Sequence, residues 1–515
     1  VWGGNFGVNL AAGSDSNAVS LSTMIGNAQL GFYASGSASN TVTQSYAWGG
    51  SYGAIFNTGS SYNAISFSTM IGISVSGLYF NGSASNTVTQ SFLSGGTNGA
   101  EFNAGAIYNV ISLSTMIGTS QTGLRSQSAA SNTVTQSYLW GATQGASLES
   151  SNNNTISLST MIGDNFGLWV FIADSNTVTE SYMRGVFDGA RIEAGADRNT
   201  ISLSTMIGST QFGLFADASA SNTVTSSYLS GSDALRLTSG ANYNAVSLST
   251  MVGTNTGFYA TVSDANTVTQ SYLWGGSRGV YFESGSDYNA ISLSTMISDS
   301  PSSSALYLAQ SSSNTIQSSY IQGSTAALVV GSTGTVITSS VLVATNTIGN
   351  ALNLTGGSSG LSLSLNTILG GPLGNGVLID GASGGSLVLS TNTILAGAER
   401  GIAVLNTPVG ASVWITSNTI LGTITPGRDT MGINLSGLAS GATVANNGIY
   451  YRTPGSGNAT GPLIVQNSPG VVIEHNRMSN PGMLIAGDYR GLFLFNADNA
   501  SIRFNDFHST GSALG

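Results

Sequence analysis

The sequence has no cysteine, no lysine and only two histidines among its 515 residues. Disulfides and thiolate metal sites are therefore excluded, and stability has to come from packing alone. Charged residues make up only 7% of the chain, whereas a typical soluble domain has about 25%. The surface must therefore consist largely of Ser, Thr, Asn and Gly.

The charge that is present is mostly of one sign. All 12 basic residues are arginine, and the net charge is -10 with a pI near 4.4. A chain without a basic stripe is poorly suited to the phosphates of nucleic acid or anionic lipid, so both are excluded as partners. No apolar run approaches the roughly 18 residues of a membrane helix, so no membrane span is predicted in this segment.

What the sequence has in abundance is a repeat. Every 22 to 25 residues an asparagine opens the same ten-residue phrase, at Asn17, Asn40, Asn63, Asn86, Asn109, Asn132, Asn154, Asn176, Asn199, Asn222, Asn244, Asn266, Asn289 and Asn314. A second repeating position, or column, lies five residues after each asparagine. It is serine from Ser45 to Ser340, and in the later repeats it is asparagine, at Asn366, Asn392, Asn418, Asn447, Asn476 and Asn505. Such self-similarity predicts one elongated solenoid.

Each phrase alternates apolar and small polar residues. In residues 41–43 (Thr-Val-Thr) and 64–66 (Ala-Ile-Ser), one branched apolar residue lies between small ones, which is the period of a strand. A second short strand follows a glycine about ten residues later, as in residues 77–80. Because helix formers are scarce and a unit this short cannot bury a core alone, each unit is predicted to be one coil of a parallel β-helix.

Two kinds of unit alternate, so the larger period is 44 to 46 residues. The regular two-coil repeats are predicted for residues 1–330, and larger, less regular coils of the same solenoid for residues 331–515. All but one of the eight prolines lie in this second part. Residues 1–17 align on residues 273–289, so the chain begins within a repeat. Its ends are expected to be cuts from a longer precursor or the limits of an ordered region.

In the C-terminal part, residues 472–476 (Val-Ile-Glu-His-Asn) and 501–505 (Ser-Ile-Arg-Phe-Asn) end short strands in an Asn turn. Here the chain resembles the right-handed parallel β-helix repeat proteins of the pectin-lyase-like superfamily. Its N-terminal repeats are most like the long secreted repeat proteins of bacteria. The resemblance implies an all-β fold, a single right-handed parallel β-helix solenoid, and the two columns together imply about 21 coils.

That superfamily contains lyases, hydrolases, epimerases, phage tailspikes and adhesins, so the resemblance alone implies no single function. The catalytic motifs of its polygalacturonases and alginate epimerases, such as Asn-Thr-Asp and Asp-Pro-His-Glu, do not occur.

The asparagine columns are interpreted as a structural ladder, because stacked Asn side chains can satisfy buried backbone groups from coil to coil. Columns of Thr, such as Thr41 and Thr43, are also typical of ice-binding faces, but every second coil has Ala and Ser there. Aromatic residues recur every second coil and could stack against sugar rings, although packing in the core or in turns is the simpler interpretation. They are Tyr46, Tyr138, Tyr182, Tyr228 and Tyr272.

Charged residues concentrate in two places. One coil contains Glu180, Arg184, Asp188, Arg191, Glu193, Asp197 and Arg198. In the last two coils, Glu474 and Arg503 share one register, as do Arg477 and Asp506, so both pairs are expected to be ion pairs across coils. If the chain is an enzyme, carboxylates with an Arg or His in a groove are needed, and the candidates are Glu474, His475, Asp488, Arg490 and Arg503. The scattered acids predict no metal site and no cofactor.

The favoured interpretation is therefore a noncatalytic extracellular or cell-surface repeat protein, such as a stalk, an adhesin or a filament-forming rod. The expected partners are a second copy joined end to end or the rest of a precursor, and glycans. The alternative is a secreted polysaccharide-binding or polysaccharide-degrading enzyme of the lyase, hydrolase or epimerase type, with its site on the C-terminal coils.

Overall fold

The computed structural model describes residues 1–396, 399–423, 431–452, 461–480 and 491–509. All regular structure in these residues is β-strand. None of the described segments forms a helix long and apolar enough to cross a membrane. The chain divides into two compact units, Val1–Gly253 (unit 1) and Thr254–Gly515 (unit 2).

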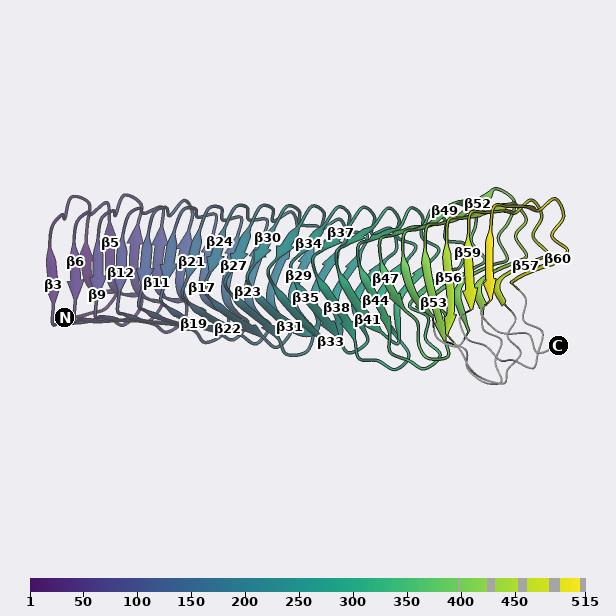
Figure 1. Ribbon diagram of the computed structural model, residues 1–515. Helices are drawn as coiled ribbons and strands as arrows, with labels where there is room; N and C mark the ends of the chain where they lie inside the picture. Colours follow the sequence, from purple (N-terminus) through teal and green to yellow (C-terminus); the bar gives the residue numbers. More distant parts are fainter. Residues whose placement is uncertain (397–398, 424–430, 453–460, 481–490, 510–515) are drawn as a thin grey trace. The chain divides into compact units, whose positions relative to one another are not determined.

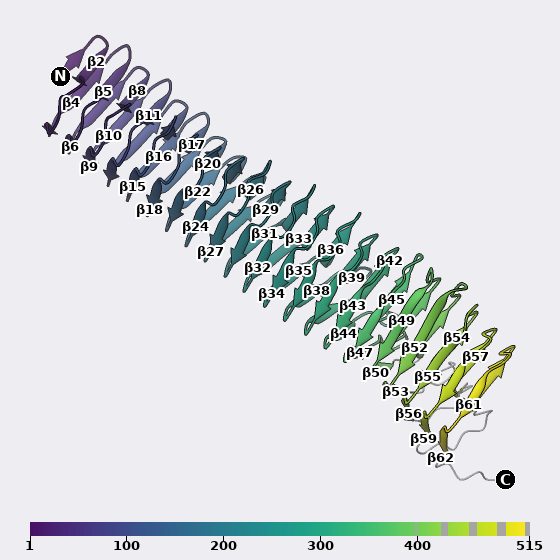
Figure 2. The same ribbon diagram turned by 90° about the horizontal axis from the view of Figure 1, so that it is seen from above.

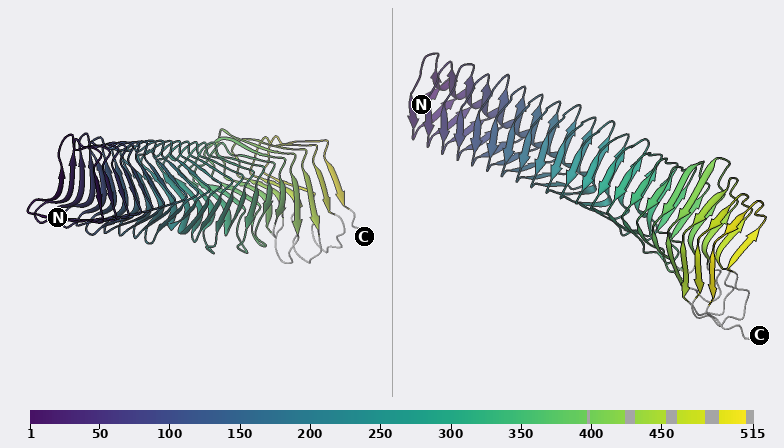
Figure 3. Two further views of the ribbon diagram at one scale, coloured as in Figure 1. Left: turned by 90° about the vertical axis from the view of Figure 1, so that its left-hand side faces the viewer. Right: turned by 45° about the horizontal axis from the view of Figure 1, so that its top comes forward.

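Each regular coil of unit 1 has three strands, here called the short, second and third strand. In one coil these are β15 (Val110–Ser112), β16 (Thr115–Gly118) and β17 (Thr122–Gln127). Each strand pairs in parallel with its equivalent in the next coil, as β15 does with β18 (Thr133–Thr135). Figures 1 and 3 show these rows of paired strands along unit 1.

The short strands of unit 1 are β3 (Ala18–Ser20), β6 (Thr41–Thr43), β9 (Ala64–Ser66), β12 (Thr87–Thr89), β15, β18, β21 (Thr155–Ser157), β24 (Thr177–Thr179), β27 (Thr200–Ser202), β30 (Thr223–Thr225) and β32 (Ala245–Ser247). The second strands are β1 (Trp2–Gly3), β4 (Thr23–Gly26), β7 (Tyr46–Gly49), β10 (Thr69–Gly72), β13 (Phe92–Gly95), β16, β19 (Tyr138–Gly141), β22 (Thr160–Gly163), β25 (Tyr182–Gly185) and β28 (Thr205–Gly208). The third strands are β2 (Phe6–Leu10), β5 (Leu30–Ser35), β8 (Tyr52–Asn57), β11 (Ser76–Asn81), β14 (Asn98–Asn103), β17, β20 (Gln144–Glu149), β23 (Phe166–Phe171), β26 (Asp188–Glu193) and β29 (Phe212–Asp217). In β31 (Tyr228–Thr238) the second and third strands are continuous, and β33 (Thr250–Thr261) crosses the unit boundary.

In unit 2 the short strands are β34 (Thr267–Thr269), β37 (Ala290–Ser292), β40 (Thr315–Gln317), β43 (Val336–Thr338), β46 (Ser362–Ser364), β49 (Gly385–Ser390), β52 (Ala411–Thr416), β55 (Ala442–Ala445), β58 (Val472–Glu474) and β61 (Ser501–Arg503). The second strands are β35 (Tyr272–Gly275), β38 (Thr295–Ser298), β41 (Tyr320–Gly323), β44 (Val341–Ala344), β47 (Thr367–Leu369), β50 (Thr393–Ala396), β53 (Thr419–Thr423), β56 (Gly448–Arg452), β59 (Arg477–Asn480) and β62 (Asp506–Ser509). The third strands are β36 (Arg278–Glu283), β39 (Ser304–Ala309), β42 (Thr325–Val330), β45 (Leu352–Thr355), β48 (Val377–Asp380), β51 (Arg400–Leu405), β54 (Met431–Ser436), β57 (Gly461–Gln466) and β60 (Leu492–Phe495).

The predicted fold class is confirmed: the chain is an all-β, right-handed parallel β-solenoid, the hand that parallel crossover connections almost always take. It has about 18 turns, and 21 short strands lie among the described residues, against the 21 coils expected.

The core is built from columns of inward side chains. The alternation in each short strand buries its central residue, as with Ile111 and Val134. On the third strands of the first coils, Phe56, Phe80 and Phe102 share one register and form a column with ring centroids 5.4 and 5.6 Å apart. Phe32 packs on Phe56 from a position two residues away in register, with ring centroids 5.6 Å apart. Because equivalent residues stack at the strand spacing, each coil completes the burial of its neighbours.

Two glycines in each regular coil permit the turn between the second and third strands. A Cβ at Gly118 would lie 2.0 Å from the carbonyl oxygen of Thr122. A Cβ at Gly123 would lie 2.6 Å from the carbonyl oxygen of Gly145 in the next coil. Backbone segments therefore approach so closely here that any larger side chain would overlap them.

The asparagine ladder is present in both units. The backbone N and side-chain Nδ2 of Asn109 both donate to Oδ1 of Asn132, at 2.9 and 3.0 Å, and Nδ2 also donates to the carbonyl oxygen of Ser83. The serine column bonds similarly, and Ser340 N donates to Asn366 Oδ1 at 2.8 Å where the column changes to asparagine. Both repeating polar side chains are therefore occupied within the solenoid.

Candidate functional site

The most varied side chains of unit 1 lie on the outer face of its third strands. We call the outward residues of β11, β14, β17, β20, β23 and β26 the third-strand face. At its central position, paired residues in successive coils are Tyr79, Glu101, Arg125, Ser147 and Trp169. These five side chains are aromatic, acidic, basic, hydroxylic and aromatic in turn, so this face is where one coil differs chemically from the next.

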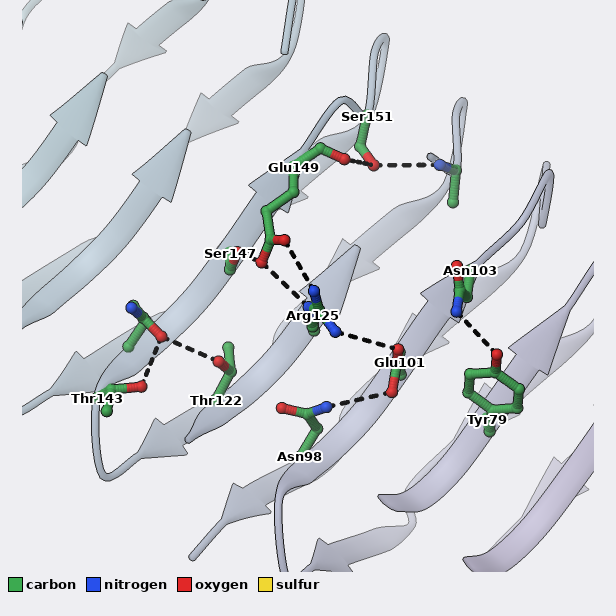
Figure 4. Close-up of polar contacts among 12 residues, drawn as sticks. Tyr79, Asn98, Glu101, Asn103, Thr122, Arg125, Thr143, Ser147, Glu149 and Ser151 are labelled. Carbon is green, nitrogen blue, oxygen red and sulfur yellow. Dashed lines mark hydrogen bonds and ion pairs between the residues drawn. The ribbon is translucent and has the colours of Figure 1, made fainter. Parts of the chain in front are cut away.

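An acidic and basic cluster occupies the middle of this face (Figure 4). Arg125 lies between Glu101 on one neighbouring strand and Glu149 on the other. Its Nη2 and Nε lie 2.9 and 3.1 Å from the two carboxylate oxygens of Glu149, and its Nη1 lies 3.7 Å from Glu101. Glu101 also accepts hydrogen bonds from Ser76 at 3.2 Å and Asn98 at 3.1 Å.

The two carboxyl groups differ in their affinity for protons. Burial raises the pKa of Glu101, because the lowering by Arg125 and by hydrogen bonds only partly offsets desolvation. At Glu149 burial also acts to raise the pKa, but the hydrogen bonds from Arg125 and Ser147 outweigh it, and the pKa is lowered. Glu149 is therefore held as a carboxylate, whereas Glu101 is the weaker acid of the pair.

A second cluster follows on the same face. Arg191 Nη1 lies 3.1 Å from Asp188, and its Nε lies 2.7 Å from Glu193. The Arg191 guanidinium also lies 4.4 Å from the ring centroid of Phe215, and Trp169 Nε1 donates to Glu193 at 2.8 Å. Burial raises the pKa of Asp188 to about 6, only partly countered by Arg191. Aromatic rings and ion pairs are thus interleaved along the face.

An open cavity of about 500 Å³ lies over the first cluster, lined by Gln121, Thr122, Arg125, Thr143, Gln144, Glu149 and Trp169. The hydroxyls of Thr122 and Thr143 donate to Gln144 Oε1 at 3.0 and 2.6 Å, which orients its amide. Ligand sites in proteins commonly measure about 300–1,000 Å³ and combine apolar walls with a few oriented polar groups. This cavity offers a carboxylate, a guanidinium, an amide and an indole.

These groups suit binding better than proton transfer. A general acid or base has to exchange its proton with a substrate within hydrogen-bonding reach. Glu101 is only 5% exposed, and Glu149 is bound by Arg125 and by Ser147. Both carboxyl groups are therefore engaged in holding Arg125.

The tyrosines considered as a sugar-stacking ladder lie on the outer side of second strands in both units. Tyr138, Tyr228 and Tyr272 are each 38% exposed, and Tyr46 and Tyr182 are half-buried. The rings therefore lie outside the core, and packing in turns stays an interpretation. In unit 1 their coil-to-coil neighbours are threonines, such as Thr115 and Thr160 beside Tyr138, so the rings do not form an unbroken stack. Their role in binding carbohydrate stays a prediction.

The C-terminal candidates are only partly brought together. Arg503 Nε lies 2.6 Å from Glu474, and Arg477 Nε lies 3.8 Å from Asp506, in the register expected for ion pairs across coils. His475 stacks on Phe504 with ring centroids 5.1 Å apart. Asp488 and Arg490 lie outside the described residues. An active site on these coils stays a prediction.

Sequence reasoning did not find the cluster around Arg125, although it noted the charged coil that contains Asp188. A usable signal was present. Within nearly identical repeats, the residues of the third strand vary from copy to copy while the Asn, Ser and Gly positions do not. A search for the variable positions, rather than for dense charge, would have found this face.

Solved structures similar to this chain include three β-helix proteins. The Dettilon tailspike protein is 13% identical over 76% of this chain and 60% of its own, with a TM-score of 0.29. The surface adhesin PfbA of Streptococcus pneumoniae is 10% identical over 70% and 85% of the two chains (TM-score 0.29), and the PL6 family alginate lyase AlyGC is 8% identical over 98% and 97% (TM-score 0.25). At these TM-scores the likeness carries no argument about function. Among curated proteins, no relative matches.

The sequence profile of one protein family matches in three overlapping segments, residues 69–211, 107–290 and 188–366. Together these segments span residues 69–366, which is more than half of the chain. The family is described as periplasmic copper-binding protein (NosD). With its coils, its asparagine ladder and this match, the chain belongs to the NosD family of right-handed β-helix proteins.

Proposed function

We propose that the protein is a noncatalytic scaffold of the cell envelope or the extracellular space that binds a carbohydrate on its third-strand face. The observation that carries this proposal is the cavity of about 500 Å³ in unit 1, whose lining includes Trp169 together with the polar residues Gln144 and Glu149. The family's description as periplasmic supports the location. The repeating Asn and Ser side chains are used for internal hydrogen bonds, which supports the scaffold role.

Carbohydrates fit the chemistry of this cavity. A sugar presents hydroxyl groups that both donate and accept, and carboxylates, amides and guanidinium groups are suitable partners for them. The less polar face of a sugar ring can pack on an indole. Because Arg125 is already paired with Glu101 and Glu149, the cluster as a whole has no net positive charge to attract an anion. We therefore infer a neutral glycan rather than an acidic one.

Copper does not fit the described residues. The chain has no cysteine, and no group of three or more His, Asp or Glu residues in the described segments could hold a metal ion. The methionines of the second strands, such as Met116 and Met161, are fully buried in the core. Copper sites use accessible sulfur or imidazole ligands, so the family's copper-binding description is not extended to this chain.

The test is binding of neutral and acidic oligosaccharides by calorimetry, followed by the variant Trp169→Ala. We expect a neutral oligosaccharide to bind, and the variant to lower its affinity about tenfold, the equivalent of about 1.4 kcal/mol. Trp140 lies on β19, outside the residues that line the cavity, so Trp140→Ala is the matched control and should bind normally.

Two results would contradict the proposal. If no oligosaccharide binds, or if both tryptophan variants bind like the original protein, the cavity is not a carbohydrate site. If the protein releases shorter sugars during incubation, the noncatalytic part of the proposal is wrong.

A further inference from the structure

The short strands of unit 1 form a sheet whose outer face is nearly free of charge. Figure 2 shows members of this row, such as β6, β9, β15 and β18, in sequence along unit 1. The residues that flank each buried Val or Ile point outward and are mostly threonine and serine. Hydroxyls of adjacent coils bond to each other, as Ser66 does to Thr43 at 3.0 Å and Ser157 to Thr135 at 2.9 Å. Some of the hydroxyl groups on this face are therefore already hydrogen-bonded to each other.

A row of exposed apolar side chains borders this sheet. The residue that follows the short strand in every second coil is half or more exposed, and these residues are Leu21, Phe67, Leu113, Leu158, Leu203 and Leu248. In the intervening coils the same corner carries Gln44, Gln90, Gln136, Glu180 or Ser226. The apolar row thus recurs with the two-coil period of the sequence.

These corners have an unfavourable backbone for leucine. Leu113, Leu158 and Leu203 have φ values of 51°, 49° and 50°, in the left-handed region. Gly and Asn adopt this conformation more easily than leucine does. Neither folding nor solubility explains a strained and exposed leucine repeated at regular intervals, so another use for the row has to be sought.

The opposite border of the same sheet carries tyrosines in the same coils. Tyr62, Tyr108 and Tyr243 precede their short strands and are each more than 60% exposed. Each of these coils therefore presents an apolar residue at both edges of the face, with small residues between them. The other three coils of the leucine row have Ser16, Asn153 or Arg198 at the tyrosine position. The intervening coils have serine at that border and glutamine, glutamate or serine at the other, so apolar ridges alternate with polar strips.

The face is large enough for a stable interface. The six corner residues and three tyrosines would bury about 900 Å² at roughly 100 Å² each, and a standard protein interface buries about 800 Å² per partner. Exposed apolar surface beyond the singly scattered residues of an ordinary protein surface often marks an interaction site. Among the corner residues on both borders in unit 1, the charged ones are Glu180 and Arg198, and they have opposite signs.

We propose that this short-strand face binds a second copy of the same chain, side by side. Ridges two coils apart are separated by about 10 Å, twice the strand spacing. A partner that contacts the whole row must repeat at the same interval, and the chain itself has that period. The near absence of charge allows two identical faces to meet without like-charge repulsion, and the ridges of one copy can lie in the polar strips of the other.

The experiment is sedimentation of the full chain over a range of concentrations, compared with the triple variant Leu113→Asn, Leu158→Asn and Leu203→Asn. We expect the original chain to rise from 52.1 kDa toward twice that mass as concentration increases. The variant should stay at the monomer mass. Asparagine suits the left-handed corner, so the variant should melt no lower than the original chain when both are dilute and monomeric.

The control changes the same corner in the intervening coils, with Gln90→Asn, Gln136→Asn and Ser226→Asn together. This variant should associate like the original chain, because asparagine keeps the strips polar and the apolar ridges are unchanged. A monomeric original chain at every concentration, or a leucine variant that still associates, would overturn the proposal.

A second measurement does not depend on the folding of the leucine variant. The chain has no cysteine, so Ser157→Cys on β21 can carry one photoreactive benzophenone label, and Ser94→Cys on β13 can carry the same label on another row. We expect covalent dimers from the first position and few from the second. Equal yields from both positions, or dimers from neither, would mean that copies do not meet on this face.

Discussion

Replacement of Asn132 by alanine tests the ladder that joins the coils. The Asn132 side chain accepts from the backbone N and from Nδ2 of Asn109, at 2.9 and 3.0 Å. It donates to the carbonyl oxygen of Ala106 at 2.9 Å and to Asn154 Oδ1 at 3.3 Å. At about 1 kcal/mol for each hydrogen bond, the free energy of unfolding should fall by about 4 kcal/mol. The buried Asn109 amide that is left unsatisfied adds a further cost.

The loss should be local. Contacts in a solenoid join only neighbouring coils, so the substitution should weaken only the interfaces between the β18 coil and the coils on either side of it. We would measure urea unfolding and the hydrogen exchange of backbone amides. Exchange should accelerate in β15 and β18, while the strands of unit 2 keep their protection.

The matched control is Asn27→Ala, because Asn27 is exposed. Its effect should be within about 0.5 kcal/mol of zero. If Asn132→Ala lowers the free energy of unfolding no more than this control does, the asparagine ladder is not what holds successive coils together. The interpretation of the whole column as structural would then be refuted.

Two further predictions concern the pH dependence of stability and the close packing of the backbone. The pKa of Asp188 is raised from 3.8 to about 6 in the folded protein, so its stabilising contribution is full below pH 3.8 and is lost as the pH rises through 6, by about 3 kcal/mol in all. Urea unfolding near pH 4 and pH 7 should show this step in the original chain and not in Asp188→Asn; the same pH dependence in both would contradict the assignment. Gly123→Ala should destabilise by about 2 kcal/mol or more, because the new Cβ would lie 2.6 Å from a carbonyl oxygen, whereas Gly4→Ala, with open space around it, should change the melting temperature little. Equal melting temperatures for the two glycine variants would refute the close approach.

The fold could be predicted from the sequence because the repeat is a physical constraint as well as a pattern. A unit such as residues 109–131 cannot bury its single row of apolar residues alone, so it has to stack on its neighbours. The position of Val134 between two threonines fixes which side of the strand faces the core. Asn132 and Ser137 then define the register between coils, because the backbone N of each donates to the side chain of its equivalent in the next coil, Asn154 and Ser159.

The sequence could also place the C-terminal ion pairs. Glu474 and Arg503 occupy the same position relative to Asn476 and Asn505, and equal positions become neighbours when coils stack. Local periodicity is therefore sufficient wherever a contact joins one coil to the next in the same column.

The site was decided by the tertiary structure. Glu101, Arg125 and Glu149 are 24 residues apart in sequence, and nothing local to any of them indicates burial. Only the folded coil brings Ser76 and Asn98 to the Glu101 carboxyl and forms the cavity that Gln144 and Trp169 help to line. Charge density in the sequence therefore pointed to the last coils instead.

The environments of the third-strand face and of the exposed corners beside the short strands were likewise decided by the tertiary structure. The sequence by itself determined which residues repeat, and hence the coils, the ladder and the two-coil period, because these depend on nearest-neighbour stacking. Exposure of Leu113 at a strained corner, and desolvation of Asp188 on the third-strand face, depend on which side of the coil each residue takes. Leu113 is exposed at a left-handed turn, and Asp188 lies between Phe166 and Phe212 of the adjacent coils, so both environments become visible only when the chain is folded.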